Sequence, residues 1–130
     1  MLSDKIILFI GMPGSGKTYW AHELCDIVVD DIIDLNSLPL SLNGNVLGIC
    51  DVNFCDPVVL NKAIQILRGI YGDIFIDLFY FENDSKKCRR NVAYRDDGRN
   101  VEGTIRRFEG TYSPPSNAAK IWVDTTTESV

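Results

Sequence analysis

Short apolar runs alternate with helical patterns along this chain of 130 residues. The first run, residues 6–10, is apolar at every position, as in a parallel strand that is buried on both faces. Four further runs predict strands over residues 26–32, 45–50, 73–81 and 119–125. This alternation is typical of an α/β domain in which helices cover both faces of a parallel sheet.

Helical patterns fill most of the intervals between these predicted strands. The first helix is expected over residues 16–25. The second begins at Pro57, where a missing N–H costs nothing, with Asp56 as its N-cap, and it runs to about Gly69. The residues that share its apolar face are Leu60, Ile64 and Leu67.

Two more helices are expected between the fourth and fifth strands. Asp84 or Ser85 caps a helix that reaches Arg95, and Asn100 caps a shorter one. The shorter helix has an apolar stripe of Val101, Ile105 and Phe108. Five parallel strands joined by right-handed crossovers predict a single doubly wound α/β domain.

The first strand leads directly into a glycine-rich loop, GMPGSGKT, which matches the phosphate-binding pattern G-x-x-x-x-G-K-[ST]. Backbone N–H groups of such a loop turn inward to hold phosphate oxygens, and the following helix N-terminus adds a positive dipole end. In this interpretation Lys17 contacts the β- and γ-phosphates, and the Thr18 hydroxyl binds Mg²⁺. The predicted nucleotide-binding residues are Gly11, Met12, Pro13, Gly14, Ser15, Gly16, Lys17 and Thr18.

Carboxylates follow two of the predicted strands, where ligands bind in parallel sheets. Asp51 ends the third strand, and we expect it near Mg²⁺ if that strand lies beside the first. Asp30 and Asp31 end the second strand, with Asp34 close behind, and Asp30 would then lie farther out, facing the phosphate acceptor. Any of these four is a candidate general base. Since neighbours on a strand point to opposite faces, only one of Asp30 and Asp31 is expected to point at the site.

The chain is acidic overall, yet it carries a cluster of arginines. The net charge of −5 argues against broad electrostatic capture of nucleic acid. Six arginines nevertheless fall between the fourth and fifth strands: Arg89, Arg90, Arg95, Arg99, Arg106 and Arg107. In this segment Cys88 and Val92 would dock the first helix, so that Arg90 and Arg95 reach the phosphates and neutralise charge in the transition state.

Other features of the sequence narrow the class of protein. The four cysteines form no C-x-x-C pair, so they are expected to be small buried side chains rather than zinc ligands. The apolar run near the N-terminus is too short for a signal peptide or a membrane span. We therefore expect a soluble cytoplasmic protein without a membrane partner.

Several segments together resemble the small P-loop kinases of bacteriophages, near the kinase domain of phage polynucleotide 5′-kinase and the adenylate-kinase-like group. The segments that carry the resemblance are GMPGSGKT, the acidic end of the second strand, CDVNFCDP, CRRNVAYR and IRRFEGTYSPP. The resemblance implies a three-layer sandwich with strand order 2-3-1-4-5 and a closing lid at about residues 84–112. It also implies a location in the host cytoplasm if the chain is phage-encoded.

The resemblance further implies an ATP- and Mg²⁺-dependent phosphotransferase acting on a nucleotide or a nucleic-acid 5′ end. Asp30 matches the general base of the polynucleotide kinases, and Asp51 and Asn53 match their D-x-N motif. Arg90 and Arg95 match the arginines of the lid. The expected catalytic residues are Lys17, Asp30, Asp51, Arg90 and Arg95, with Thr18 and Asp51 on the metal. The alternatives are a nucleotide-binding regulatory or interaction protein and a slow NTPase that has no phosphate acceptor.

Overall fold

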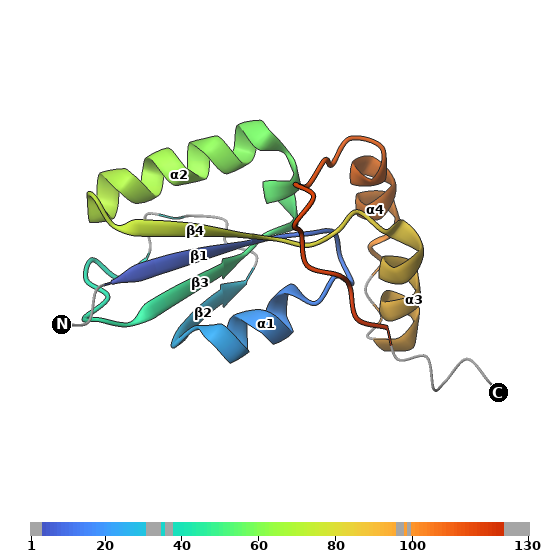
Figure 1. The fold of residues 1–130 in the computed structure, drawn as a ribbon, viewed down its shortest axis with the longest axis horizontal. Coiled ribbons are helices and arrows are strands. Elements are labelled where there is room, and N and C mark those ends of the chain that lie inside the picture. The colour runs from blue at the N-terminus through green and yellow to red at the C-terminus, as the bar shows by residue number, and fades with distance from the viewer. Residues whose placement is uncertain (1–3, 31–34, 36–37, 96–97, 99, 124–130) are drawn as a thin grey trace.

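The computed structural model describes residues 4–30, 35, 38–95, 98 and 100–123. A parallel sheet of four strands in the order β2-β3-β1-β4 forms the centre of the fold (Figure 1). The strands are β1 (Lys5–Ile10), β2 (Ile27–Asp30), β3 (Val46–Cys50) and β4 (Phe75–Tyr80). β1 pairs with β3 on one side and β4 on the other, and residues 6–10 are buried, as their uninterrupted hydrophobicity predicts.

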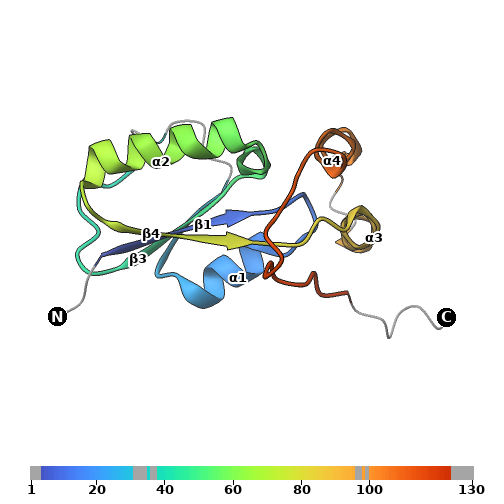
Figure 2. The ribbon, with the colours of Figure 1, turned by 45° about the horizontal axis from the view of Figure 1, so that its top comes forward.

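Two helices cover the two faces of the sheet, and two more lie beyond the carboxyl ends of the strands (Figures 1 and 2). The helices are α1 (Lys17–Leu24), α2 (Pro57–Tyr71), α3 (Ser85–Arg95) and α4 (Glu102–Glu109), with a short 3₁₀ helix, η2 (Val52–Cys55). α1 and α2 lie on opposite faces. None of the helices within the described residues has the length and apolar character needed to cross a bilayer.

Side-chain caps set the helix boundaries much as the sequence predicts. The Asp56 carboxylate accepts a hydrogen bond from the Val58 amide at the start of α2. The Asp84 carboxylate accepts one from the Lys87 amide in the first turn of α3. Asn100 accepts a hydrogen bond from the first amide of α4, although it lies one residue before the N-cap. The predicted caps of α2 and α3 are confirmed, whereas the N-cap of α4 is Val101, one residue after the predicted Asn100.

The expected fifth strand is the main correction to the predicted fold. Where a strand was expected over residues 119–125, the structure has only an isolated parallel bridge between Ala119 and Phe81, and positions 124 and 125 lie outside the described residues. The Ile121 amide donates instead to the Glu82 carboxylate, and the Trp122 carbonyl accepts from the Asn91 side chain. The Glu82 side chain thus takes the Ile121 amide, the next group after Ala119 that a fifth strand would turn toward β4. The sheet of the described residues therefore has four strands rather than five in the order 2-3-1-4-5.

α3 and α4 form one unit that is fastened to the end of the sheet. The Arg89 guanidinium donates to Glu102 at 2.9 and 3.0 Å and to Glu109 at 3.0 Å, which joins the two helices. The Asn83 amide donates to the carbonyls of Glu109 and Tyr112. The buried Tyr112 hydroxyl donates to the carbonyls of Ile10 and Phe81, at the ends of β1 and β4.

Candidate functional site

The loop between β1 and α1 contains a tight turn at residues 12–15. The Ser15 amide donates to the Met12 carbonyl at 3.2 Å, with Pro13 and Gly14 between them. Gly14 has a φ of 85°, and proline followed by a residue of positive φ is the signature of a type II turn. Gly16, at a φ of 101°, ends the loop as the N-cap of α1. Gly14 and Gly16 therefore stand where L side chains are disfavoured.

Gly14 is also the place where α3 meets the loop. A Cβ added at Gly14 would clash with the Cys88 carbonyl oxygen and lie 3.0 Å from Val92 Cγ2. Cys88 is fully buried, so the predicted docking of α3 through Cys88 and Val92 is confirmed. The helix approaches the main chain of the loop directly, which only a glycine allows.

Several amides at the start of α1 have no hydrogen-bond acceptor among the described residues. These amides belong to Gly16, Lys17 and Thr18. The first N–H groups of any helix lack partners within that helix, and together they carry the positive end of its dipole. Three such donors in succession after a glycine turn form an anion-binding surface, and they fit the phosphates of a nucleotide.

The Lys17 ammonium lies inside the loop. Its Nζ donates to the carbonyls of Gly11 at 2.8 Å and Met12 at 3.0 Å, and it lies 3.5 Å from the hydroxyl of the buried Ser15. Only 8% of Lys17 is exposed, although lysine is normally among the most exposed residues. Burial lowers the pKa of Lys17, and nearby groups, including Asp30, oppose that shift. An anion at the loop would therefore find a cation with little competing water.

Thr18 and Asp30 are in direct contact at the mouth of the loop. The Thr18 hydroxyl donates to Asp30 Oδ2 at 2.8 Å, and both side chains are exposed. Two oxygens on neighbouring corners of a Mg²⁺ octahedron, with bonds of about 2.1 Å, are about 3 Å apart. The pair therefore fits two protein ligands of a magnesium ion whose other ligands are phosphate oxygens and water. No group of three or more metal-binding side chains occurs within the described residues, and a nucleotide-bound Mg²⁺ needs none.

Asp51 has a different local role. Its Oδ1 accepts from the Asn53 amide at 2.9 Å and from the Asn53 side chain at 3.1 Å, which caps η2. β3 does lie beside β1, as expected, yet the structure brings Asp30 rather than Asp51 against Thr18. Asp31 and Asp34, the other candidates for a base, lie outside the described residues.

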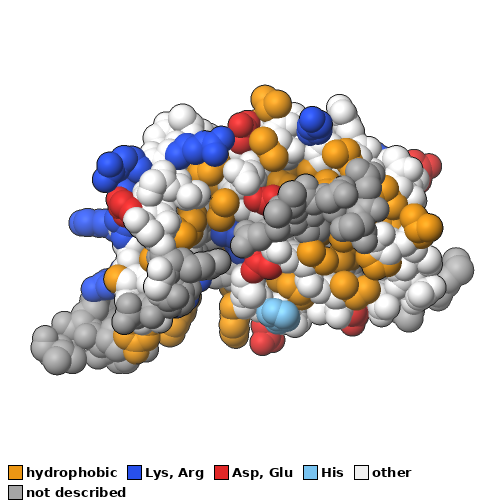
Figure 3. All heavy atoms as spheres, turned by 180° about the vertical axis from the view of Figure 1, so that it is seen from behind, with side chains coloured by type: hydrophobic (Ala, Val, Ile, Leu, Met, Phe, Trp, Pro, Cys, Tyr) orange, Lys and Arg blue, Asp and Glu red, His pale blue; other side chains and the backbone are white. Residues whose placement is uncertain are grey.

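Arg90 and Arg95 are both exposed on α3. Other exposed cations on α3 and α4 are Lys86, Arg106 and Arg107. In the space-filling view, Lys and Arg side chains gather over α3 and α4, and a hollow separates this part from the body of the sheet (Figure 3). The acidic chain thus carries a basic surface next to the candidate site.

Three thiols surround the inner side of the loop. Cys50, Cys55 and Cys88 are buried and make no disulfide. Burial raises the pKa of Cys55 to about 12 and of Cys88 to about 11, and the positive charge of Lys17 opposes both shifts. Cys55 and Cys88 are therefore uncharged at neutral pH, and all three buried cysteines pack as small side chains, as predicted.

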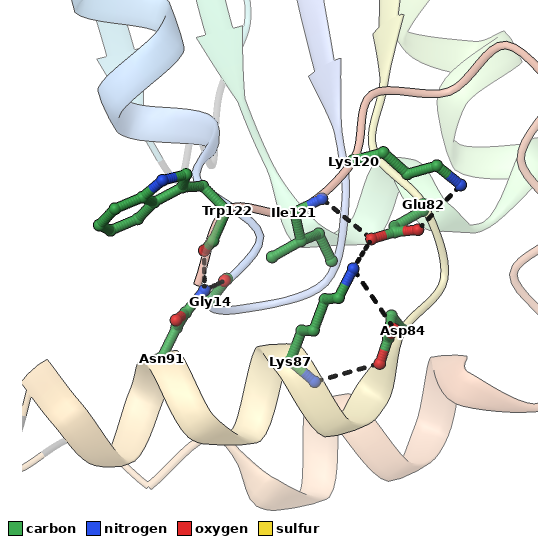
Figure 4. A network of polar contacts seen from close by, with 8 residues as sticks. All are labelled: Gly14, Glu82, Asp84, Lys87, Asn91, Lys120, Ile121 and Trp122. Carbon is green, nitrogen blue, oxygen red and sulfur yellow. Dashed lines mark hydrogen bonds and ion pairs between the residues drawn. The ribbon is translucent and has the colours of Figure 1, made fainter. Parts of the chain in front are cut away.

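Two polar residues that the sequence analysis did not single out hold α3 in place (Figure 4). Asn91 Nδ2 donates to the carbonyls of Gly14 at 2.9 Å and Trp122 at 3.0 Å. Glu82 accepts from Lys87 at 2.8 Å and from the Ile121 amide at 3.0 Å, and it pairs with Lys120. A signal for Asn91 was present, because it lies three residues after Cys88 and one before Val92, on the face predicted to dock.

The pKa of Glu82 is lowered by the groups that donate hydrogen bonds to it. Burial by itself would raise the pKa of Glu82, but hydrogen bonds from Lys87, the Ile121 amide and Lys120 outweigh burial and lower the pKa. The carboxylate therefore stays charged at neutral pH. It links the start of α3 to the segment that follows Ala119.

Comparisons with known proteins identify a relative in sequence and a similar structure, and neither name states an activity. The chain matches no protein-family model. It is 34% identical over 112 residues to an uncharacterized protein, R277, of Acanthamoeba polyphaga mimivirus, and the match covers 75% of this chain and 78% of the relative. The crystal structure of APE1195 has a similar fold, with a TM-score of 0.57 at 17% identity over 98% of this chain and 88% of that one.

Proposed function

This chain belongs to the family of the mimivirus protein R277, and from the geometry of its glycine loop we propose that it is a P-loop kinase. The enzyme would transfer the γ-phosphate of MgATP to a nucleotide or to the 5′ end of a nucleic acid. Its resemblance to the small kinases of bacteriophages suggests this reaction class. The proposal rests on one observation, a glycine loop that encloses the Lys17 ammonium and ends in three amides with no acceptor among the described residues.

The phosphate end of the substrate fits this loop by charge and by shape. The amides of Gly16, Lys17 and Thr18 would hold phosphate oxygens, and Lys17 would exchange its two carbonyl acceptors for the β- and γ-phosphates. That exchange replaces weak neutral acceptors with anionic ones in a site that already excludes water. Thr18 would hold Mg²⁺, with Asp30 as a second protein ligand if another carboxylate is the base, and the ion would neutralise charge on the transferred group.

The contact between Thr18 and Asp30 supports two roles for Asp30. Asp30 can hold the metal through one carboxylate oxygen, or it can accept the proton of the attacking hydroxyl as general base. We keep the base assignment for Asp30 and take Asp51 as the second candidate, since it ends the neighbouring strand β3. Arg90 and Arg95 would stabilise the transferred phosphoryl group from α3, which already lies against the loop at Gly14.

The basic surface of α3 and α4 supports an acceptor that is itself anionic. Phosphate groups of a nucleotide or of a nucleic-acid strand would be attracted to it, and this attraction would weaken as the salt concentration rises.

The proposal is tested by incubating the protein with γ-labelled ATP, Mg²⁺ and a panel of nucleoside monophosphates and 5′-hydroxyl oligonucleotides. We expect the label to move to one class of acceptor and the Lys17→Ala variant to show no transfer. Release of labelled phosphate alone would instead indicate an NTPase. Tight ATP binding with neither product would indicate a regulatory or interaction protein.

A further inference from the structure

The side chain of Asn91 joins three segments that are far apart in the sequence. Its amide nitrogen donates to Gly14 of the phosphate loop and to Trp122 of the C-terminal segment, while Asn91 itself belongs to α3 (Figure 4). Both donated protons of one amide group are thus used, one on each carbonyl. We propose that Asn91 is a positioning residue that holds the phosphate loop in its anion-binding shape, an inference that rests on the nucleotide binding proposed above.

The peptide between Gly14 and Ser15 is where this contact acts. In a trans peptide the carbonyl and the N–H point in opposite directions, so fixing the Gly14 carbonyl also fixes the Ser15 amide. That amide closes the turn on the Met12 carbonyl at 3.2 Å. Gly14 has no Cβ to resist rotation, so its own conformation does not hold this peptide plane. Asn91 adds a second restraint on this plane, from outside the loop, to the bond between Ser15 and Met12.

A rotation of this peptide would be harmful to anion binding. It would turn the partially negative Gly14 carbonyl away from Asn91, and the Ser15 amide would lose its acceptor on Met12. An inward carbonyl would repel the phosphate oxygens that the neighbouring amides attract. The effect would be on the loop itself, so it would be similar for ADP and for ATP.

The second bond of Asn91 extends this coupling to the C-terminal segment. Trp122 is 74% exposed, and its carbonyl is held by Asn91 rather than by a neighbouring strand. The same side chain therefore ties the loop to the segment that replaces the predicted fifth strand. A phosphate ligand that restricts the motion of the loop should therefore also restrict the motion of the backbone at Trp122.

The hydrogen bonds of Asn91 can be measured directly by NMR in the wild-type protein. We expect the Asn91 side-chain amide protons to exchange with solvent at least tenfold more slowly than those of the exposed Asn117. Equal exchange rates for the two residues would overturn the proposal, whether or not any variant folds.

Variants then test the role in binding, with labelled MgADP as the probe. We expect Asn91→Ala and the isosteric Asn91→Asp to bind ADP at least tenfold more weakly than the wild type, at similar melting temperatures. Tyr94→Ala, on an exposed part of the same helix, should bind normally. Unchanged binding by both Asn91 variants would overturn the positioning role but leave the kinase proposal intact. No binding by the wild type would overturn both.

Discussion

A buried ammonium, an exposed hydroxyl and an exposed carboxylate define the chemistry at the scale of single residues. Lys17 is enclosed by the carbonyls of its own loop, while Thr18 and Asp30 contact each other at the loop's mouth. The sequence predicted all three as site residues, but it could not predict the contact between the last two. They lie twelve positions apart, and their meeting depends on how β2 ends beside α1.

Replacing the Asp30 carboxylate separates its two possible roles. If Asp30 is the general base, Asp30→Asn should lower kcat by about 10²–10⁴-fold with ADP affinity nearly unchanged, because a base acts in the transition state. If Asp30 is a metal ligand, the Mg²⁺ concentration for half-maximal activity should rise severalfold instead. Steady-state kinetics over a range of Mg²⁺ concentrations measures both.

Asp77→Asn is the matched control for this experiment. Asp77 lies in the middle of β4, where its side chain is half-exposed and pairs weakly with Lys5 at 3.8 Å. Its replacement should alter neither kcat nor the Mg²⁺ requirement. Wild-type kinetics for Asp30→Asn would move the base assignment to Asp51, or to Asp31 or Asp34.

At the scale of elements, the site depends on how closely α3 approaches the loop and on how firmly α3 and α4 are attached to the sheet. Backbone packs against backbone at Gly14, and side-chain hydrogen bonds from Asn83, Arg89 and Tyr112 fasten the helices. These contacts were not predictable from the sequence, since each joins segments whose relative position is set only by the complete fold. The helix pattern did predict which face of α3 docks.

Gly14→Ala should destabilise the protein by about 2 kcal/mol or more, because alanine disfavours the left-handed region and its Cβ would clash with the Cys88 carbonyl. The matched control is Gly69→Ala in α2, where a Cβ meets no atom within 4 Å. That change should stabilise the protein by up to about 1 kcal/mol. Urea unfolding measures both, and equal effects from the two variants would refute the close packing of α3 on the loop.

Tyr112→Phe tests the attachment of the helical unit to the sheet. The variant removes a buried hydroxyl that donates to the Ile10 and Phe81 carbonyls, and we expect a loss of about 1–2 kcal/mol in unfolding free energy. Tyr94→Phe, at a position that is 67% exposed, should cost less than about 0.5 kcal/mol. A similarly small loss of unfolding free energy in both variants would show that the Tyr112 hydroxyl does not stabilise the packing of α3 and α4 on the sheet.

At the scale of the whole molecule, the pattern of hydrophobic positions predicted the central strands and the helices. The prediction that failed is the fifth strand, at the edge of the sheet beside β4. Continuous apolar runs identified β1 and β3, because strands buried on both faces carry that pattern. The run at residues 119–125 also reads as a strand in the sequence, but the Glu82 side chain takes the Ile121 amide that would pair with β4. Such side-chain competition depends on tertiary contacts, so local propensity did not reveal it.

Calorimetric titration with MgATP measures whether the loop at residues 11–18 binds the phosphates of a nucleotide. We predict one binding event per chain, weakened roughly ten- to hundredfold in Lys17→Ala, as expected for loss of a charged hydrogen-bonding group. Lys62→Ala, an exposed change on α2, should bind like the wild type. If no nucleoside di- or triphosphate gives binding heat, or if the wild type and Lys17→Ala bind with equal affinity, the loop is not a nucleotide-binding site.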